Sequence, residues 1–180
     1  MSINNLFEKG NKFFLAQNHI AGLEVYKQIL FKYPKNIRLS EEIKKKTKKF
    51  RIFVQPTFSP TQIDEFFELH KLGKTNLVIQ TLNDTYKSNQ DNVLSISLLG
   101  TFLAMNEEYV EAIKFQKLAV EKAPFEIPFY LNLSETLIQI NRLEESLSTL
   151  YFAKVLSLKD KSIDYKLAKI HTKLKNYLKA

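Results

Sequence analysis

The stretch from Val93 to Glu126 constrains the fold of this chain more than any other part. It divides into two helix-length halves separated by the polar segment 106–109, and Pro124 stands near its end. Apolar residues recur at intervals of three and four, which is the spacing of one face of an α-helix. Proline ends a helix because it supplies no amide hydrogen and clashes with the preceding turn. The stretch therefore predicts two helices joined by a short turn.

Small residues stand where these two helices would meet. Gly100 and Ala112 allow the helices to approach closely, and Ala119 allows the next unit to stack against them. The full pattern consists of Ile96, Leu99, Gly100, Leu103, Ala112, Ala119 and Pro124. It resembles the tetratricopeptide repeat, a helix-turn-helix unit of about 34 residues, with Gln116 in place of the aromatic residue usual in that family. The resemblance implies an α-solenoid, which hosts many different functions.

Other segments carry further copies of the unit, of which the one at 63–86 is degenerate. One copy spans 6–34, and a second, at 63–86, follows Ser59-Pro60-Thr61-Gln62, which predicts a capping box with proline at the first helical position. A third copy spans 130–153. The single amphipathic helix at 162–178 is predicted to cap the array, because the end of a stacked array needs a polar outer face. The chain is thus predicted to be an all-α solenoid of tetratricopeptide-like repeats.

The first two copies are separated by more residues than the repeat length explains. These additional residues are predicted to form an extra helix. Ser40 is predicted to cap this helix, with acidic residues in its first turn. Its basic patch comprises Lys44, Lys45, Lys46, Lys48, Lys49 and Arg51. We therefore expect the first repeat and the basic helix at 1–54, a connector at 55–60, and three further repeats with the capping helix at 61–180. Together they would form one continuous solenoid domain.

Composition limits the possible classes of protein. The chain has 180 residues, a formal net charge of +8 and no cysteine, so disulfides, thiolate metal sites and cysteine nucleophiles are excluded. Its first residues lack the apolar core of a signal peptide, and no apolar run reaches the roughly 18 residues of a membrane span. We therefore expect a cytoplasmic protein with no transmembrane segment; that it is bacterial is implied only by the resemblance of its repeat arrangement to bacterial proteins. A net positive charge is compatible with nucleic acid, anionic membrane or acidic protein partners.

The residues that usually carry catalysis are scattered. His19, His70 and His171 fall in three separate units, and no spacing pairs two of them as metal ligands. The acid pairs Glu107-Glu108 and Glu144-Glu145 are expected at the start of the following helices, where the helix dipole favours them. The sequence therefore predicts a protein that is not an enzyme, with no catalytic residues, no metal and no cofactor.

The resemblance also implies a working surface. In this family the first helix of each pair lines the concave side of the solenoid, and residues beside the packing stripe face the groove. The predicted groove residues are Ile63, Phe67, His70, Leu94, Ser97, Thr101, Leu131, Glu135, Tyr165 and Lys169. This mixture of apolar and polar side chains suits a peptide or helix laid in a groove. The competing interpretation is that Phe67 and Leu131 only fill space between helices.

Three functions follow from these observations. The leading hypothesis is a non-enzymatic protein-protein interaction module, or scaffold, that binds a peptide or helix in the concave groove. The second is implied by a resemblance: the arrangement, including the segment that begins at Ser59-Pro60-Thr61-Gln62-Ile63, resembles bacterial proteins in which such repeats precede a glycosyl- or sulfotransferase domain. This chain would then be an accessory or substrate-recognition subunit, which would need a separate catalytic partner. The third is binding of an anionic polymer or membrane through the basic helix at 44–51. The sequence leaves the identity of the partner and the oligomeric state open.

Overall fold

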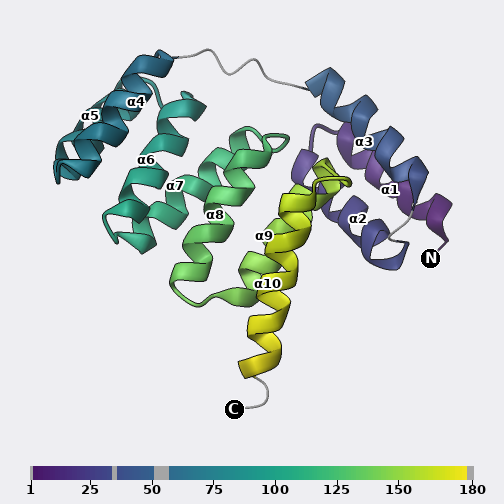
Figure 1. The fold of residues 1–180 in the computed structure, drawn as a ribbon. Helices are drawn as coiled ribbons and strands as arrows, with labels where there is room; N and C mark the ends of the chain where they lie inside the picture. Colours follow the sequence, from purple (N-terminus) through teal and green to yellow (C-terminus); the bar gives the residue numbers. More distant parts are fainter. Residues whose placement is uncertain (1, 34–35, 51–56, 178–180) are drawn as a thin grey trace.

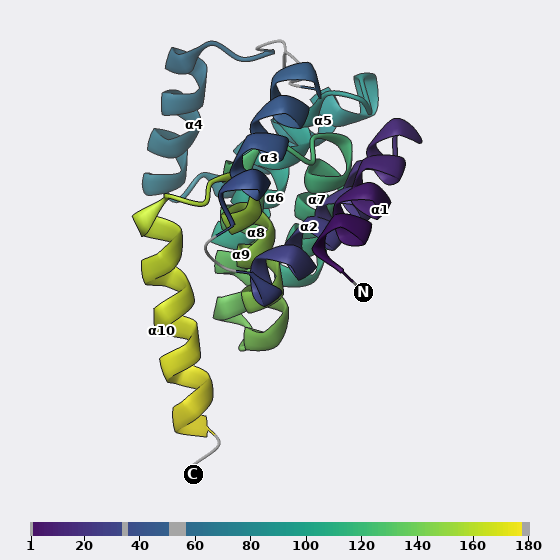
Figure 2. The same cartoon turned by 90° about the vertical axis from the view of Figure 1, so that its right-hand side faces the viewer.

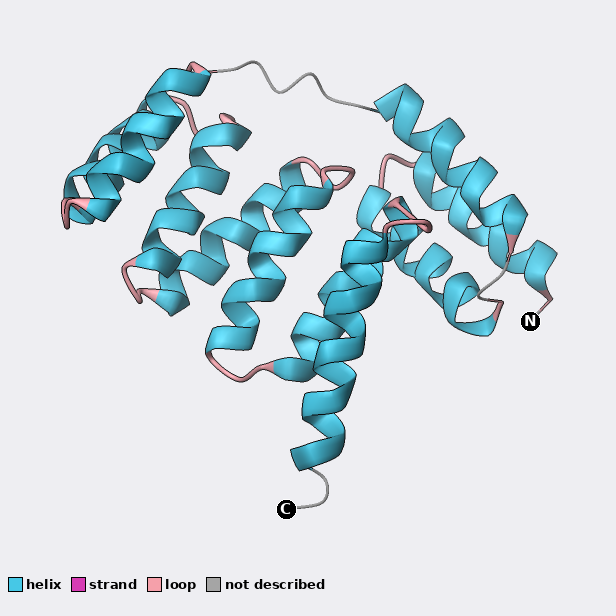
Figure 3. Ribbon diagram, in the orientation of Figure 1, coloured by secondary structure: helices cyan, strands magenta, loops and turns pink. Residues whose placement is uncertain are grey.

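The computed structural model describes residues 2–33, 36–50 and 57–177, and these residues form helices and no strand (Figure 3). The helices are α1 (Ile3–Leu15), α2 (His19–Lys32), α3 (Ile37–Phe50), α4 (Pro60–Lys71), α5 (Thr75–Ser88), α6 (Val93–Met105), α7 (Tyr109–Lys122), α8 (Ile127–Gln139), α9 (Leu143–Leu156) and α10 (Lys161–Tyr177). The predicted all-α architecture of paired helices is confirmed. From α4 to α10 each helix packs against the next, so that the pairs form a curved row (Figure 1).

The turns inside the helical pairs repeat one backbone conformation. Gly73, Glu107 and Asn141, each about one repeat length of 34 residues after the last, have φ of 75°, 64° and 59°. Gln17 takes the same conformation in the turn between α1 and α2, with φ of 59°. A left-handed residue at the end of a helix reverses the chain and satisfies the last carbonyl groups. Each turn therefore sends the second helix of its pair back along the first.

Local start signals set two helix boundaries. The predicted capping box is confirmed at α4, where the Ser59 hydroxyl accepts from the Gln62 amide at 3.2 Å and the Ser59 amide donates to the Gln62 side chain at 2.9 Å. The predicted start of α3 at Ser40 is wrong, because the helix begins at Ile37. The Asn36 side chain accepts from the Leu39 amide at 2.9 Å and so fixes the earlier start.

Gly100 allows α6 and α7 to touch, as the sequence predicted. A Cβ atom at this position would lie 2.8 Å from Gln116 Cγ and 3.1 Å from the Gln116 backbone nitrogen. Gly10 has the same role in the first pair, where a Cβ atom would lie 2.6 Å from the ring of Tyr26 on α2. The separations of 2.8 Å at Gly100 and 2.6 Å at Gly10 are shorter than packed carbon atoms tolerate, so a larger residue at either position would force the neighbouring helix or side chain to shift.

The first helical pair lies beside the last one. Although α3 precedes α4 in sequence, α2 and α3 pack against α9 at the opposite end of the row from α4 (Figure 1). Val155 of α9 is fully buried in one core with residues of α1, α2 and α3. The rings of Phe31 and Tyr151 lie 4.1 Å apart, and the Lys27 ammonium donates to Ser148 Oγ at 3.1 Å. The stack therefore runs from α4 to α9 and then to the N-terminal helices.

Three further cores hold the rest of the row, and the smallest consists of Ile113, Leu133 and Leu137. Phe102 of α6 is fully buried among Phe66 and Phe67 of α4, while Phe58 packs edge-on against Phe66 at 5.2 Å. A second core joins α8, α9 and α10 and includes Leu150 and Ile163. Figure 2 shows α4 and α10 along one edge of the molecule and α1 at the opposite edge. The predicted connector lies partly outside the described residues, and the division of the chain at 55–60 stays a prediction.

Candidate functional site: the face of α6, α8 and α10

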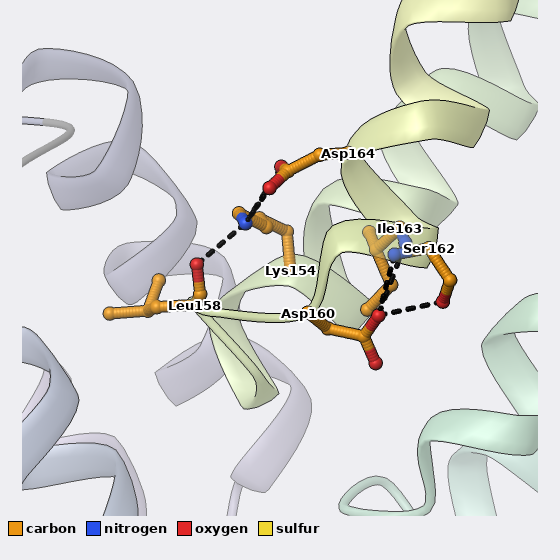
Figure 4. A network of polar contacts seen from close by, with 6 residues as sticks. All are labelled: Lys154, Leu158, Asp160, Ser162, Ile163 and Asp164. Atoms are coloured by element: carbon orange, nitrogen blue, oxygen red, sulfur yellow. Dashed lines mark hydrogen bonds and ion pairs between the residues drawn. The ribbon is translucent and has the colours of Figure 1, made fainter.

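The start of α10 is held by a capping carboxylate. Asp160 Oδ1 accepts from the Ser162 amide at 2.8 Å, from the Ser162 hydroxyl at 2.6 Å and from the Ile163 amide at 3.4 Å (Figure 4). These amides belong to the first turn of the helix, where no backbone acceptor is available to them. Hydrogen bonds to Asp160, first that of the Ser162 hydroxyl, lower the pKa of its carboxyl below the ordinary value. The ionised side chain therefore fixes where α10 begins.

A lysine connects this helix to α9. The Lys154 ammonium donates to the Leu158 carbonyl at 2.6 Å and pairs with the Asp164 carboxylate at 2.7 Å (Figure 4). The Lys154 side chain is only 12% exposed, so solvent screens this pair less than an ordinary surface pair. The loop from α9 and the first turn of α10 are thereby joined, and α10 is held in a defined direction across α8.

Asp160→Ala should loosen α10. We expect a loss of about 1 kcal/mol in the stability of this helix, the usual cost of removing a capping side chain. Because the folded pKa of Asp160 is lowered, its contribution is present at neutral pH and is lost as the pH falls through that pKa. Hydrogen exchange of α10 amides at neutral and acidic pH measures both effects. Asp84→Ala, at an exposed acid of α5, is the control, and equal exchange in both variants would contradict the assignment.

A cavity of about 280 Å³ lies between α8 and α10. Its lining residues are Glu135, Ile138, Ser162, Tyr165, Lys166, Lys169, Ile170 and Lys173. Tyr165 is 70% exposed, so its ring is accessible to a ligand. Lys166 pairs with Glu135 at 3.1 Å, and both side chains are partly exposed. With three lysines and one glutamate, this cavity favours an acidic or aromatic ligand group.

A second cavity, of about 290 Å³, lies between α6 and α8. It is lined by Thr101, Ala104, Met105, Tyr109, Gln116, Asn132, Glu135, Thr136 and Gln139. Glu135 lines both cavities, so together they extend across α6, α8 and α10 on one face of the row. We call these two neighbouring cavities together the groove. Asn132 of α8 donates from Nδ2 to Thr101 Oγ1 of α6 at 3.2 Å, and this hydrogen bond connects the two helices.

Gln116 forms part of the wall of the α6–α8 cavity and is 3% exposed. Its Nε2 donates to the carbonyl of Gly100 at 3.2 Å, which fixes the orientation of the amide. Its Oε1 is buried and has no hydrogen-bond partner among the residues that the structure describes. Leaving a buried acceptor unpaired costs about 1–3 kcal/mol. Gln116 stands where the repeat typically carries an aromatic residue, and the sequence did not predict that it lines a cavity.

The predicted groove residues fall into two groups. Thr101, Glu135, Tyr165 and Lys169 line the groove. The other six contact neighbouring helices: Ile63, Phe67, Leu94 and Leu131 are half-buried against cores, Ser97 is buried, and His70 lies against α5. The role of each residue in binding stays a prediction.

Phe67 and His70 have specific packing partners. The Phe67 ring centroid lies 5.1 Å from that of Phe102, and the His70 ring lies 6.3 Å from the same phenylalanine. His70 Nδ1 also lies 2.9 Å from Thr75 Oγ1, within hydrogen-bonding distance. These contacts fasten α4 to α5 and α6. Sequence spacing placed these side chains on the correct helix but did not show that a neighbouring helix covers them.

The basic helix α3 is described only in part. Among its predicted patch, Lys45 is exposed and the Lys46 ammonium lies 5.6 Å from the ring centroid of Phe14 on α1. Arg51 lies outside the described residues. A cation over an aromatic ring contributes to packing within the chain. Anion binding by Lys44, Lys45, Lys46, Lys48, Lys49 and Arg51 stays a prediction.

A third cavity, about 680 Å³ in volume, lies where the turn between α1 and α2 meets α7. Lys117, Glu121 and His19 are among its lining residues. Burial lowers the pKa of His19, whose ring lies 5.3 Å from that of Phe125. The sequence did not predict this cavity, because it forms only when the N-terminal pair docks beside α9.

Within residues 2–33, 36–50 and 57–177, no cluster of histidine, aspartate and glutamate side chains is arranged to hold a metal ion. Among the helices of the described part, none combines the length and the apolar character that crossing a bilayer requires.

No protein-family model and no curated protein sequence matches this chain. Several solved structures do match this chain. A crystal structure of MamA has 18% sequence identity and a TM-score of 0.55, and the match covers 60% of this chain and 63% of that chain. The pHSP90 complex of the TPR2AB domain of yeast Sti1 has 15% identity and a TM-score of 0.52, covering 94% and 68%. YrrB, described as a TPR protein with an unusual peptide-binding site, has 16% identity and a TM-score of 0.51, covering 89% of each chain.

These likenesses, together with the paired helices and the repeated left-handed turns, show that the chain has the tetratricopeptide-repeat fold. The fold predicted from the spacing of Ile96, Gly100, Ala112 and Pro124 is confirmed.

Proposed function

We propose that this chain is a non-enzymatic protein-interaction module that binds a peptide or helical segment of another protein in the groove. The observation that carries the proposal is that two cavities, one between α6 and α8 and one between α8 and α10, lie next to each other and share Glu135 as a lining residue. Each cavity, at about 280–290 Å³, has the size of one or two side chains and lies at the lower end of small-molecule sites. A segment that places successive side chains in the two cavities fits this arrangement.

The solved structures support the same class of partner. The Sti1 structure is of a complex with pHSP90, and the description of YrrB names a peptide-binding site. Tyr165 supplies an exposed aromatic anchor, and side chains of this type contribute much of the binding energy in protein interfaces. Lys169 and Lys173 supply positive charge next to it. An acidic side chain of the partner is therefore expected in the α8–α10 cavity.

A selection from a displayed peptide library tests the proposal directly, with the purified full chain as bait. Peptides should be enriched, and Tyr165→Ala and Lys169→Glu should each weaken their binding about tenfold or more, as loss of an interface anchor does. The matched controls are Leu72→Ala and Lys9→Glu. The Leu72 side chain is as exposed as that of Tyr165, and Lys9 lies on α1, away from the groove. Failure to enrich any peptide, or equal binding by all four variants, would overturn the proposal.

A further inference from the structure

The N-terminal helices meet the rest of the chain on α9. We propose that this face of α9 also accepts helices α1–α3 of a second copy of the chain, so that two copies exchange these helices and form a closed dimer. The partner is therefore another molecule of the same protein. The groove lies on α6, α8 and α10, so this contact goes beyond the proposed function and does not depend on it.

Helices α1–α3 are joined to one another by contacts that do not involve α9. The rings of Phe14 and Tyr26 lie 5.2 Å apart, and the Tyr26 hydroxyl donates to Asn11 Oδ1 at 3.0 Å, which joins α1 to α2. Arg38 of α3 donates to Asn4 Oδ1 of α1 at 2.9 Å. Because the three helices keep these contacts when they leave α9, they can dock as one unit.

One side of α2 makes the contact with α9. Lys27 and Phe31 lie one helical turn apart and so face the same direction. The Lys27 ammonium donates to Ser148 Oγ at 3.1 Å and lies 4.3 Å from the ring centroid of Phe152. The rings of Phe31 and Tyr151 lie 4.1 Å apart. Three of these side chains are aromatic, and aromatic residues are enriched in contacts between separate protein chains.

The face of α9 needs a cover. Val155 is fully buried in the core that α9 shares with α1–α3, and the rings of Tyr151 and Phe152 pack against the same core. When α1–α3 leave, these three side chains become an exposed apolar face, which favours binding of a partner. Helices α1–α3 of another copy carry the matching side chains, Lys27 and Phe31, in the same arrangement.

The path of the chain makes exchange possible without loss of contacts. Helices α3 and α4 follow each other in sequence but lie at opposite ends of the row (Figure 1). A second copy offers the same side chains to α9, so exchange replaces each contact by an identical one and is a low-cost route to a dimer. Since each copy gives one unit and receives one, the two contacts are equivalent and the assembly closes at two chains.

Docking within one chain competes with docking between chains. A unit tethered to its own site has an effective concentration on the order of 1 mM. Single chains therefore dominate in dilute solution. Exchange requires either a protein concentration of that order or chains in which internal docking is blocked.

Two complementary variants test the proposal without this competition. Val155→Lys removes the face on α9 and leaves α1–α3 intact, whereas the double variant Lys27→Glu, Phe31→Asp removes the contacts of α2 and leaves α9 intact. Each variant alone should have the mass of one chain, 21.0 kDa, by light scattering. Their equimolar mixture should contain a species of twice that mass, because α1–α3 of the first variant dock on α9 of the second. A mixture that keeps the mass of one chain, at up to about 1 mM, would overturn the proposal.

Single cysteines test exchange without blocking the contact, since the chain itself has no cysteine. Chains carrying Phe31→Cys and chains carrying Tyr151→Cys are mixed, unfolded, refolded together at about 1 mM and oxidised. Mass spectrometry should find a disulfide between positions 31 and 151, which can only join two chains. Leu72→Cys, at a side chain that is 70% exposed, replaces Phe31→Cys in the control and reports random collision. Equal disulfide yields from the two mixtures would contradict the exchange.

Discussion

Phe102→Ala should lower the free energy of unfolding by about 3–5 kcal/mol, the usual cost of removing a fully buried phenylalanine from a packed core. Phe102 is fully buried, and its ring contacts Phe66 and Phe67 of α4 at centroid distances of 6.3 and 5.1 Å. α4 itself contributes no buried residue, and the half-buried rings of Phe66 and Phe67 connect it to α6 through Phe102. Chemical denaturation measures the change in free energy.

Phe102→Ala should also reduce the stability of some helices more than of others. In a stack of repeats each pair is stabilised by its neighbours, so the amides of α4 and α5 should lose more hydrogen-exchange protection than those of α8 and α9. Leu15→Ala is the control, since Leu15 is 78% exposed. A change below about 1 kcal/mol, as is usual for surface substitutions, would show that the Phe102 cluster does not hold α4.

Local features of the fold could be predicted from the sequence because they depend on neighbouring residues. The capping box of Ser59 and Gln62 involves positions three apart, and the close contact at Gly100 follows from the spacing within one helical pair. The start of α3 was predicted incorrectly because Asn36 and Ser40 are both competent capping residues. Which of two such residues caps a helix depends on packing that the local sequence does not contain.

The order of the pairs in space could not be predicted, because it is set by contacts far apart in sequence. Each pair has an apolar surface to bury, and the sequence does not say which other pair covers it. The Lys27–Ser148 hydrogen bond and the Phe31–Tyr151 contact join residues more than a hundred positions apart. For the same reason the predicted groove included Phe67 and Leu94, which contact neighbouring helices. Gln116 departed visibly from the repeat pattern, but only the structure showed that it lines a cavity.

Val155→Lys should release the N-terminal pair from the row. Val155 is fully buried in the core that α9 shares with α1, α2 and α3, and Lys27 of α2 lies against the same helix. A lysine there would bury an unpaired cation, at a cost of about 3–5 kcal/mol. Because α2 and α3 reach the row through α9, we expect α1–α3 to lose hydrogen-exchange protection while α5–α7 keep theirs.

Val110→Lys is the matched control, because the same substitution is made at a helix position that is 66% exposed. It should leave exchange in α1–α3 unchanged. The radius of gyration in solution should rise for Val155→Lys, since a released pair extends the chain. A solenoid stacked in sequence order would place α3 beside α4, and a substitution in α9 would then leave α1–α3 protected. Unchanged protection of α1–α3 in Val155→Lys would therefore contradict the order of helices described here, because only direct packing on α9 makes the first pair sensitive to this residue.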